Sequence, residues 1–170
     1  IGPKGPFIML SRSHYGFVKR LLEIEIPELS DGTIMLYSVA RDAGSRSKIA
    51  VYTEYTNVDP IGAVIGEKGR RIANVLKELS GEKIDVILYD KDPVKFIANA
   101  LSPAKDVKVS IKDETKKEAL ALVNDKNLSL AIGKKGQNVK LASRLTHYKI
   151  EVKPEEQENT ETTEETSVEE

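Results

Sequence analysis

The 170-residue sequence contains no cysteine and no tryptophan, and only 5% of its residues are aromatic. The absence of cysteine excludes disulfides, zinc–thiolate sites and a cysteine nucleophile, and it fits a reducing compartment, so we expect a cytoplasmic protein. Because 39% of the residues are hydrophobic, we expect a packed core, which must be mainly aliphatic. Apolar runs of membrane-spanning length and a signal-peptide pattern are also missing, which predicts that the chain has no membrane partner.

Charges of the two signs are segregated along the chain. Residues 153–170 hold eight Glu and one Lys, which leaves 25 basic and 19 acidic side chains in residues 1–152 and gives net charges of −7 and +6. A basic body suggests an anionic partner, although charge alone is better explained by a solvated surface and a solubilising tail. Because the tail has almost no apolar residues, we expect residues 153–170 to be disordered.

An internal repeat organises the rest of the sequence. The segment 65–72, IGEKGRRI, recurs 67 residues later as 132–139, IGKKGQNV, and the segment 83–86, KIDV, recurs as 149–152, KIEV. Each glycine pair follows an alternating strand pattern and a short apolar helix pattern. Two copies of one small unit therefore account for the body, which divides near residues 90–93.

Both copies show the same order of predicted elements: helix, strand, strand, helix, Gly-x-x-Gly, helix, strand. In the first copy we expect one helix over 13–26, a second that starts at Pro60 with Asp59 as its cap, and a third over 70–79. We expect strands over 33–41, 48–55 and 84–89. Pro27 should help end the first helix, and residues 42–45 should form the turn between strands. In the second copy a helix opens at Asp92–Pro93, helices span 128–132 and 139–145, and strands span 107–112, 118–123 and 149–152.

Two helices that meet at a Gly-x-x-Gly turn form a seat for a phosphate. Backbone N–H groups at the start of the second helix lack partners within the helix, and the helix dipole places partial positive charge there. Glycine supplies the unusual dihedral angles and lets a nucleic-acid backbone come close. Aliphatic residues beside the turn supply a surface for unstacked bases, as in KH domains, which hold about four nucleotides of RNA.

We therefore predict a single-stranded RNA-binding site in each copy. One Gly-x-x-Gly is a weak signal, but two copies between aliphatic residues are a much stronger one. The second site should bind phosphate more strongly, because Lys134 and Lys135 stand where the first site has Glu67 and Lys68. The candidate RNA-binding residues are Ile65, Gly66, Glu67, Lys68, Gly69, Arg70, Arg71, Ile72, Ile132, Gly133, Lys134, Lys135, Gly136, Gln137, Asn138, Val139 and Lys140.

The sequence shows no pattern of catalytic, cofactor-binding or metal-binding residues. His14 and His147 are solitary, and neither glycine loop ends in the Gly-Lys-Ser/Thr of a Walker phosphate loop. The spacing of the glycines at 62, 66 and 69 does not match a dinucleotide-binding fingerprint. We therefore expect a protein that is not an enzyme and needs no cofactor.

Several phrases of the sequence resemble the NusA family of bacterial transcription factors. They are residues 58–66, VDPIGAVIG; 96–104, FIANALSPA; 128–133, LSLAIG; and 136–139, GQNV; residues 39–41 and 48–52 are also similar. The resemblance covers roughly residues 5–152. It implies an α+β fold made of tandem type II KH domains, each a three-stranded sheet covered by helices, packed rigidly together as one extended RNA-binding surface.

The resemblance also implies boundaries, a role and partners. Residues 1–10 would be a remnant of an S1 region or linker, 11–90 and 91–152 the two KH domains, and 153–170 the acidic tail; the first residue, Ile1, indicates a fragment or a processed product. The implied role is in pausing, termination and antitermination. The implied partners of the expected monomer are single-stranded RNA, other Nus factors, and RNA polymerase, which would be contacted mainly through regions absent from this chain.

Two other interpretations remain open. A ribosome-associated KH protein, or the KH portion of an assembly GTPase, would share the module, but the tandem copy argues against both. A protein-docking scaffold, in which the glycine loops are only structural and do not contact RNA, is the alternative from a different functional class.

Overall fold

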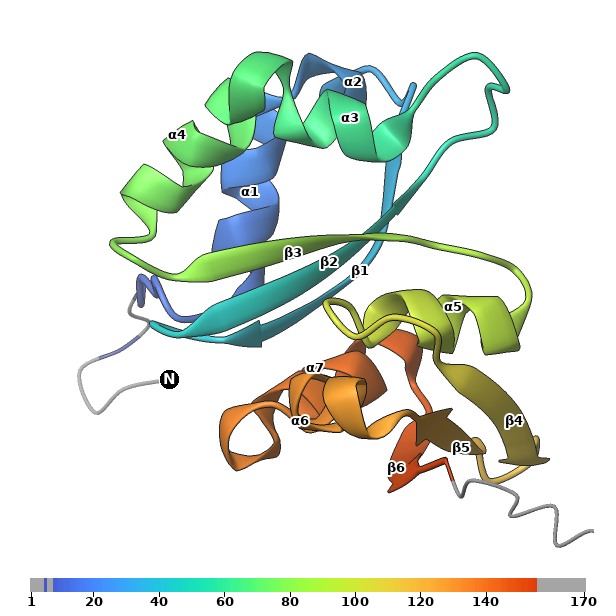
Figure 1. Cartoon of the computed structure of the whole chain (residues 1–170). Coiled ribbons are helices and arrows are strands. Elements are labelled where there is room, and N and C mark those ends of the chain that lie inside the picture. Colours follow the sequence, from blue (N-terminus) through green and yellow to red (C-terminus); the bar gives the residue numbers. More distant parts are fainter. Residues whose placement is uncertain (1–4, 6–7, 156–170) are drawn as a thin grey trace, which may run out of the picture.

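The structure, a computed structural model, describes residue 5 and residues 8–155 and contains two α+β domains in tandem (Figure 1). Each domain has a three-stranded sheet. The first domain comprises α1 (Tyr15–Glu25), α2 (Pro27–Ser30), β1 (Met35–Asp42), β2 (Arg46–Tyr52), α3 (Pro60–Ile65), η1 (Glu67–Gly69), α4 (Arg70–Glu78) and β3 (Lys83–Leu88). The second comprises α5 (Pro93–Ala100), β4 (Lys108–Asp113), β5 (Glu118–Val123), α6 (Asp125–Ile132), η2 (Lys134–Gly136), α7 (Gln137–Thr146) and β6 (Lys149–Pro154).

The two sheets have the same mixed topology. β1 is antiparallel to β2, and β2 pairs in parallel with β3; β4, β5 and β6 repeat this arrangement. A parallel pair needs a long connection between its strands, which α3 and α4 supply in the first domain and α6 and α7 in the second. The predicted fold class, α+β with a three-stranded sheet in each copy, is therefore confirmed.

An Asp-Pro pair begins one helix in each domain, as the sequence predicts. The Asp59 carboxylate accepts a hydrogen bond from the amide two residues later, and Pro60 is the first residue of α3. Asp92 and Pro93 have the same roles in α5. Proline is tolerated at this position because the N–H that it lacks would have had no partner within the helix.

Most boundaries lie within three residues of the prediction, and three differences have a clear physical reason or consequence. Pro27 follows the end of α1 but also begins α2, a short helix that the sequence analysis did not predict. α6 begins at Asp125 rather than at residue 128, because the Asn124 side chain caps it. β6 continues to Pro154, which pairs with Val123, so the first two residues assigned to the acidic tail belong to the sheet. The rest of the predicted tail from residue 156, and residues 1–4 and 6–7 of the predicted remnant, lie outside the described residues.

The sheet of the first domain is covered on both faces. Helices α1, α3 and α4 pack on one face, and α5 and α7 of the second domain lie against the other (Figure 1). On that second face Ala40, Ala50 and Ile87 share one buried cluster with Ile97 of α5 and Leu145 of α7. The same cluster includes residues of the second sheet, so α5 and α7 form a layer common to both domains.

Hydrogen bonds also cross the junction between the domains. The Ser38 hydroxyl donates to the Leu145 carbonyl oxygen over 2.8 Å. The Gln137 side-chain nitrogen lies 2.7 Å from both Asp42 Oδ2 and Ser45 Oγ, at the turn between β1 and β2. Because Gln137 is the first residue of α7, these bonds fix the start of α7, and the glycine loop before it, relative to the first domain.

Candidate nucleic-acid interface

The two glycine loops have the same backbone conformation. At their first glycines, Gly66 and Gly133, φ/ψ are 74°/173° and 75°/172°. At Lys68 and Lys135 the angles are 52°/27° and 54°/27°, in the left-handed region. The second glycine of each loop is also left-handed, with φ of 74° and 73°. The repeat found in the sequence is therefore also a repeat of loop geometry.

The two glycines of each loop are required for different reasons. A Cβ on Gly66 would lie 2.6 Å from Arg71 Cγ, and one on Gly133 would lie 2.8 Å from both Cβ and the backbone nitrogen of Asn138. The first glycine thus allows the following helix to pack closely. At the second glycine there is room for a Cβ: nothing lies within 4 Å of it at Gly69, and at Gly136 the nearest atom is Lys140 Cε, at 3.6 Å. This open space allows a ligand backbone to approach the loop closely.

Neither loop is buried against protein. The side chains of Glu67, Lys68, Lys134 and Lys135 are exposed, and within the described residues none of the four has an ion-pair or hydrogen-bond partner. A helix follows each loop at once, of nine residues in α4 and ten in α7. In each loop the amides of the second glycine and of the first helical residue bond to carbonyl oxygens of the loop, so the N–H groups left for a ligand are those that follow in the first turn, at the positive end of the helix dipole. Both loops therefore have the geometry expected of a phosphate seat.

The second residue after each loop has a structural role. Arg71 Nη1 donates to the Ala63 carbonyl oxygen and to Glu28 Oε2, each over 2.8 Å. At the equivalent position, Asn138 is 3% exposed and its amide nitrogen donates to the carbonyl oxygens of Leu101 and Ala131 over 3.1 and 3.0 Å. These side chains join the helix before the loop to the helix after it, so they fix the loop conformation from its protein side and do not face a ligand.

The first residues after the loops differ from one another. Arg70 is exposed, and the described residues offer its side chain no ion-pair or hydrogen-bond partner. Gln137, at the equivalent position, is held by Asp42 and Ser45 of the first domain. Arg70 is thus placed to meet a ligand, whereas the Gln137 amide nitrogen is engaged at the domain junction.

The aliphatic candidates beside the loops are unequally accessible. Ile65 is 37% exposed and Ile132 is half-buried. Ile72 and Val139 pack against the hydrophobic clusters of their domains. Of the four, Ile65 therefore offers the largest fraction of its surface to an unstacked base.

A cleft of about 690 Å³ opens between the two domains and was not predicted from the sequence. It lies between α3 and β3 of the first domain and the connection from α5 to β4 of the second. These segments belong to different domains, so the cleft exists only because the two domains pack together. Its lining residues are Ile61, Val86, Ile87, Leu88, Ala98, Asn99, Ser102, Ala104, Lys105, Asp106 and Val107.

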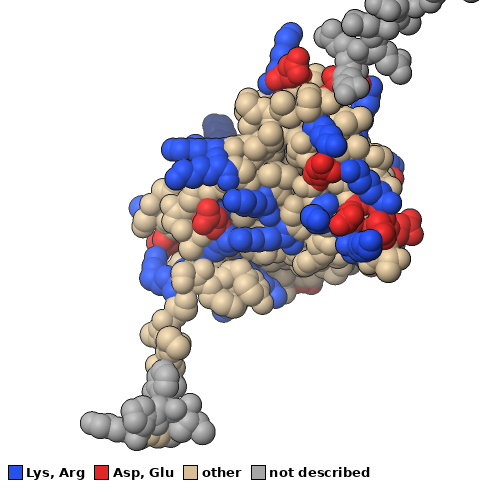
Figure 2. Space-filling view, turned by 90° about the horizontal axis from the view of Figure 1, so that it is seen from below, with Lys and Arg blue, Asp and Glu red and all other residues tan. Residues whose placement is uncertain are grey.

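Basic side chains are spread over the underside of the molecule. Figure 2 shows Lys and Arg in a band across this face, with Asp and Glu gathered mainly toward one side. At the second loop, Lys140 lies close enough for its Nζ to donate to the Lys135 carbonyl oxygen over 3.3 Å. The second loop therefore carries three lysines, whereas Glu67 places an acid inside the first.

Metal ligands and membrane-spanning helices do not occur among the residues that the structure describes. No group of three or more His, Cys, Asp or Glu side chains in residues 5 and 8–155 is arranged to hold a metal ion. No helix in the same part of the chain is long and apolar enough to cross a membrane. His14 caps α1, since its Nδ1 accepts a hydrogen bond from the Gly16 amide.

Comparison with known proteins identifies both copies of the repeat. Residues 12–89 match the model of the NusA-like first KH domain, and residues 93–160 match that of the NusA-like second KH domain. Over 152 residues the chain is 55% identical to the transcription termination/antitermination protein NusA of Halalkalibacterium halodurans and 53% identical to that of Bacillus subtilis.

These matches cover much of the chain but less than half of the relatives. The aligned stretches are 89% of this chain and 40% and 41% of the two relatives, so the chain spans about two fifths of their length. The crystal structure of APE1850 superposes with a TM-score of 0.57 and 23% identity, over 81% of this chain and 96% of that one. This last similarity supports the fold alone.

Proposed function

The chain belongs to the NusA family through both of its KH domains, and on this premise we propose that it binds single-stranded RNA with its two Gly-x-x-Gly loops. The observation that carries the proposal is the geometry of the loops. Both have the same conformation, both are exposed, and both begin a helix of at least nine residues. The backbone amides and the dipole at each helix start then hold a phosphate, and the exposed lysines add charge.

The cleft between the domains supports binding of one continuous strand. It lies against α3, whose other end leads into the first loop, and its walls come from both domains. Seven of its eleven lining residues are aliphatic, and the polar ones are Asn99, Ser102, Lys105 and Asp106. Such a surface accommodates unstacked bases between the two loops, since aliphatic contacts and a few polar groups suffice to orient a ligand.

The proposal extends to the whole protein through its relatives. By analogy with proteins named for transcription termination and antitermination, we assign the chain a role in pausing, termination and antitermination in the cytoplasm, and no enzymatic activity. RNA polymerase and other Nus factors are the proposed partners, contacted mainly through regions outside this chain, and the chain itself is proposed to be a monomer.

Reversing the charge of the second loop tests RNA binding. In the Lys134→Asp/Lys135→Asp variant we expect affinity for single-stranded RNA to fall by about tenfold or more, because two phosphate contacts are lost. The magnitude of the slope of log affinity against log salt should fall by about 1.4, because each phosphate contact on a single strand contributes about 0.7 to it. Titrations at several salt concentrations measure both quantities.

A matched variant controls for the change in net charge. Lys19→Asp/Arg20→Asp reverses two adjacent exposed charges on α1, away from both loops, and should weaken binding much less. Circular dichroism should show the same fold for both variants. Equal affinity of the loop variant and the unmodified protein at fixed salt would remove the phosphate seat and favour a protein-docking scaffold.

A further inference from the structure

The few aromatic side chains of the chain gather at one place. Of three Phe and six Tyr, four line one cleft at the junction of the two domains: Tyr37, Tyr89, Phe96 and Tyr148. The rings of Tyr37 and Tyr89 are stacked, with centroids 3.9 Å apart and an interplanar angle of 16°. Phe96 meets both edge-on, at 5.6 and 5.0 Å. The stacked aromatic rings therefore lie at the domain junction and not at the glycine loops. Neither the low aromatic content nor the loop sequences indicate such a cluster.

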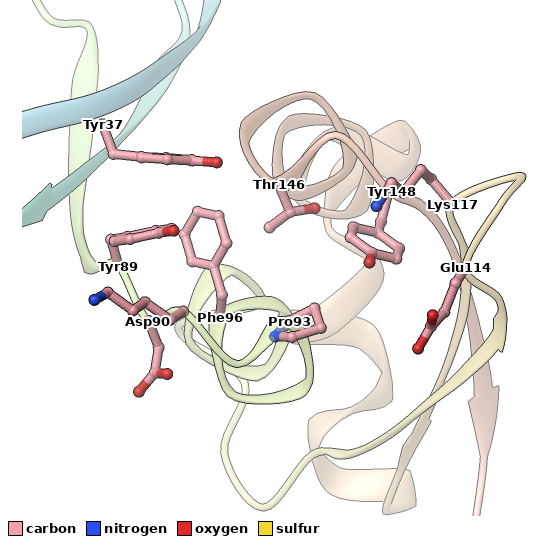
Figure 3. A pocket seen from close by; sticks show the side chains of 10 residues that line it. Tyr37, Tyr89, Asp90, Pro93, Phe96, Glu114, Lys117, Thr146 and Tyr148 are labelled. Atoms are coloured by element: carbon pink, nitrogen blue, oxygen red, sulfur yellow. The ribbon is translucent and has the colours of Figure 1, made fainter.

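These rings form one wall of a second cleft, of about 350 Å³ (Figure 3). Tyr148, which follows α7, stands on the opposite side, with Pro93 and Thr146 between the walls. Lys117 Nζ lies 5.2 Å from the centroid of the Tyr148 ring. The volume is at the lower end of the range for small-molecule sites and suits a single planar ring system. We call this site the aromatic cleft.

We propose that the aromatic cleft takes an unpaired nucleobase from the RNA strand that occupies the glycine loops. The inference rests on the proposed function and extends its binding site. Every base has a π-face, so stacking on tyrosine holds it without a requirement for sequence. Charged groups at the cleft balance, with Lys91 and Lys117 against Asp90 and Glu114. Because these four charges sum to zero, the site has no excess positive charge for a phosphate, and a neutral base with exocyclic donors and acceptors fits it better.

Helix α7 connects the second glycine loop with the aromatic cleft. The loop precedes its first residue, and Thr146, its last residue, lines the cleft. Ten residues of helix span about 15 Å, a distance that about four nucleotides cover at a rise of about 3.4 Å each. The helix contains no Asp or Glu, and its exposed Lys140 and Arg144 lie one turn apart. Arg144 has no partner within the described residues, so it is available to a phosphate along this path.

The first copy of the repeat has no tyrosine at the position equivalent to Tyr148. Tyr148 directly precedes Lys149, and at the same place in the first copy Glu82 directly precedes Lys83. Glu82 is 2% exposed and paired with Arg41, and the pocket that it lines contains the Phe17 ring but no tyrosine. The KH fold therefore does not need a tyrosine at this position, which favours a role in ligand binding.

RNAs of two lengths test the proposal. The first is an unstructured adenosine-rich RNA of about eight nucleotides, four for each KH domain. The second is the same RNA lengthened by about four nucleotides at either its 5′ or its 3′ end. For the unmodified chain we expect one of the two extensions to raise affinity about fivefold or more, the low end of the gain from stacking one base on an aromatic side chain.

Variants locate the source of that gain. Tyr148→Leu keeps the apolar contacts with the core but removes the ring, and should abolish the gain while leaving affinity for the short RNA unchanged. Lys117→Gln, at an exposed position, should reduce the gain without touching the core. Tyr15→Leu, which removes a 54% exposed tyrosine on α1, is the matched control and should retain the gain. Urea denaturation establishes that each variant is folded.

The outcomes separate this inference from the proposed function. If the short RNA binds but neither extension adds affinity, or if Tyr148→Leu retains the gain, the aromatic cleft does not bind a base, although the loops still bind RNA. If the short RNA does not bind the unmodified chain, the proposed function fails and this inference with it. Protection of Tyr148 from chemical modification by a proline-rich peptide, and not by RNA, would assign the cleft to a protein partner and overturn the proposal.

Discussion

Lys48 Nζ lies 2.7 Å from the carbonyl oxygen of Ser102, so a lysine of the first domain's central strand donates to the main chain of the second domain. The Lys48 side chain is fully buried, and its nitrogen also lies 3.0 Å from Asp85 Oδ2. Burial lowers the pKa of Lys48, while the Asp85 carboxylate opposes that shift. In the second copy the strand register places Leu120 at the position of Lys48. The KH fold therefore does not need this lysine, which serves the junction between the domains.

Lys48→Met should loosen the junction. The substitution keeps most of the side-chain volume but leaves the Ser102 carbonyl oxygen without its donor, which should cost about 1–3 kcal/mol in the free energy of unfolding. Affinity for an RNA that spans both loops should fall more than affinity for an RNA that fits one loop, since only the former depends on the relative position of the domains. Urea denaturation and titrations with the two RNAs measure these effects.

An exposed ion pair provides the control for this variant. Lys112→Met removes a lysine that is 42% exposed and paired with Glu151 on the second sheet, and should change stability by no more than about 0.5 kcal/mol. Equal losses for long and short RNA in Lys48→Met would show that Lys48 does not position the domains.

The two glycines of a loop should respond differently to alanine. Gly136→Ala should cost about 1–2 kcal/mol, because its left-handed backbone disfavours a side chain although the new Cβ would make only ordinary van der Waals contacts. Gly133→Ala should cost more, because the new Cβ would also lie 2.8 Å from the Asn138 backbone nitrogen. Chemical denaturation of both variants gives the order, and equal costs would contradict the assignment of Gly133 to helix packing.

The repeat allowed much of the fold to be predicted. The roles of residues that depend on packing between distant segments were not predicted. Asp59 and Asp92 were recognised as caps because cap and proline are adjacent in sequence. Lys48 lies in a strand, where a lysine ordinarily indicates a solvent-facing position, and only the second domain makes its burial favourable. Pro27 was taken as the end of one helix, but proline is equally suited to begin the next, and the sequence did not separate these roles.

The candidate site was predicted more completely for its backbone than for its side chains. Gly-x-x-Gly fixes the loop, but Gln137 and Asn138 are adjacent amides whose direction depends on the rotation of α7. The structure points Gln137 to the first domain and Asn138 into the interior. Tyr37 and Tyr148 stand more than a hundred residues apart in sequence, so the aromatic cleft has no local signature.

Asn138 should affect stability and not RNA contact. Asn138→Ala removes the two hydrogen bonds that join α7 to α6 and to the end of α5. The Leu101 carbonyl oxygen keeps its bond from the Ala104 amide but the Ala131 carbonyl oxygen loses this donor, so the variant should cost about 1–3 kcal/mol. RNA affinity of the folded fraction should stay within about twofold, because the side chain lies behind the loop. Titration at low temperature, where the variant remains folded, measures this affinity. A loss of tenfold or more would assign Asn138 to the RNA contact.

The buried carboxylate of Glu82 and the half-buried carboxylate of Asp85 set the response to acid. Burial raises the pKa of Glu82, but hydrogen bonds from Arg41, Ser47 and the Gly44 amide outweigh it and lower the pKa below its ordinary value. The pKa of Asp85 is lowered in the same way, since burial is outweighed by its bonds with Arg46 and Lys48. The folded protein therefore holds fewer protons on these groups than the unfolded chain over the acidic range.

The free energy of unfolding should accordingly be insensitive to these two groups above about pH 5 and decline in more acidic solution. The contribution of Glu82 is complete above its unfolded pKa, about 4.3, and is lost as the pH falls through the lower folded value. Glu82→Gln should lower stability at pH 7 but flatten the decline between about pH 5 and pH 3, as measured by urea midpoints. Glu54→Gln, an exposed control, should leave both unchanged. An undiminished decline in Glu82→Gln would place the acid sensitivity in other carboxylates, because a neutral side chain at this position no longer takes up a proton on unfolding.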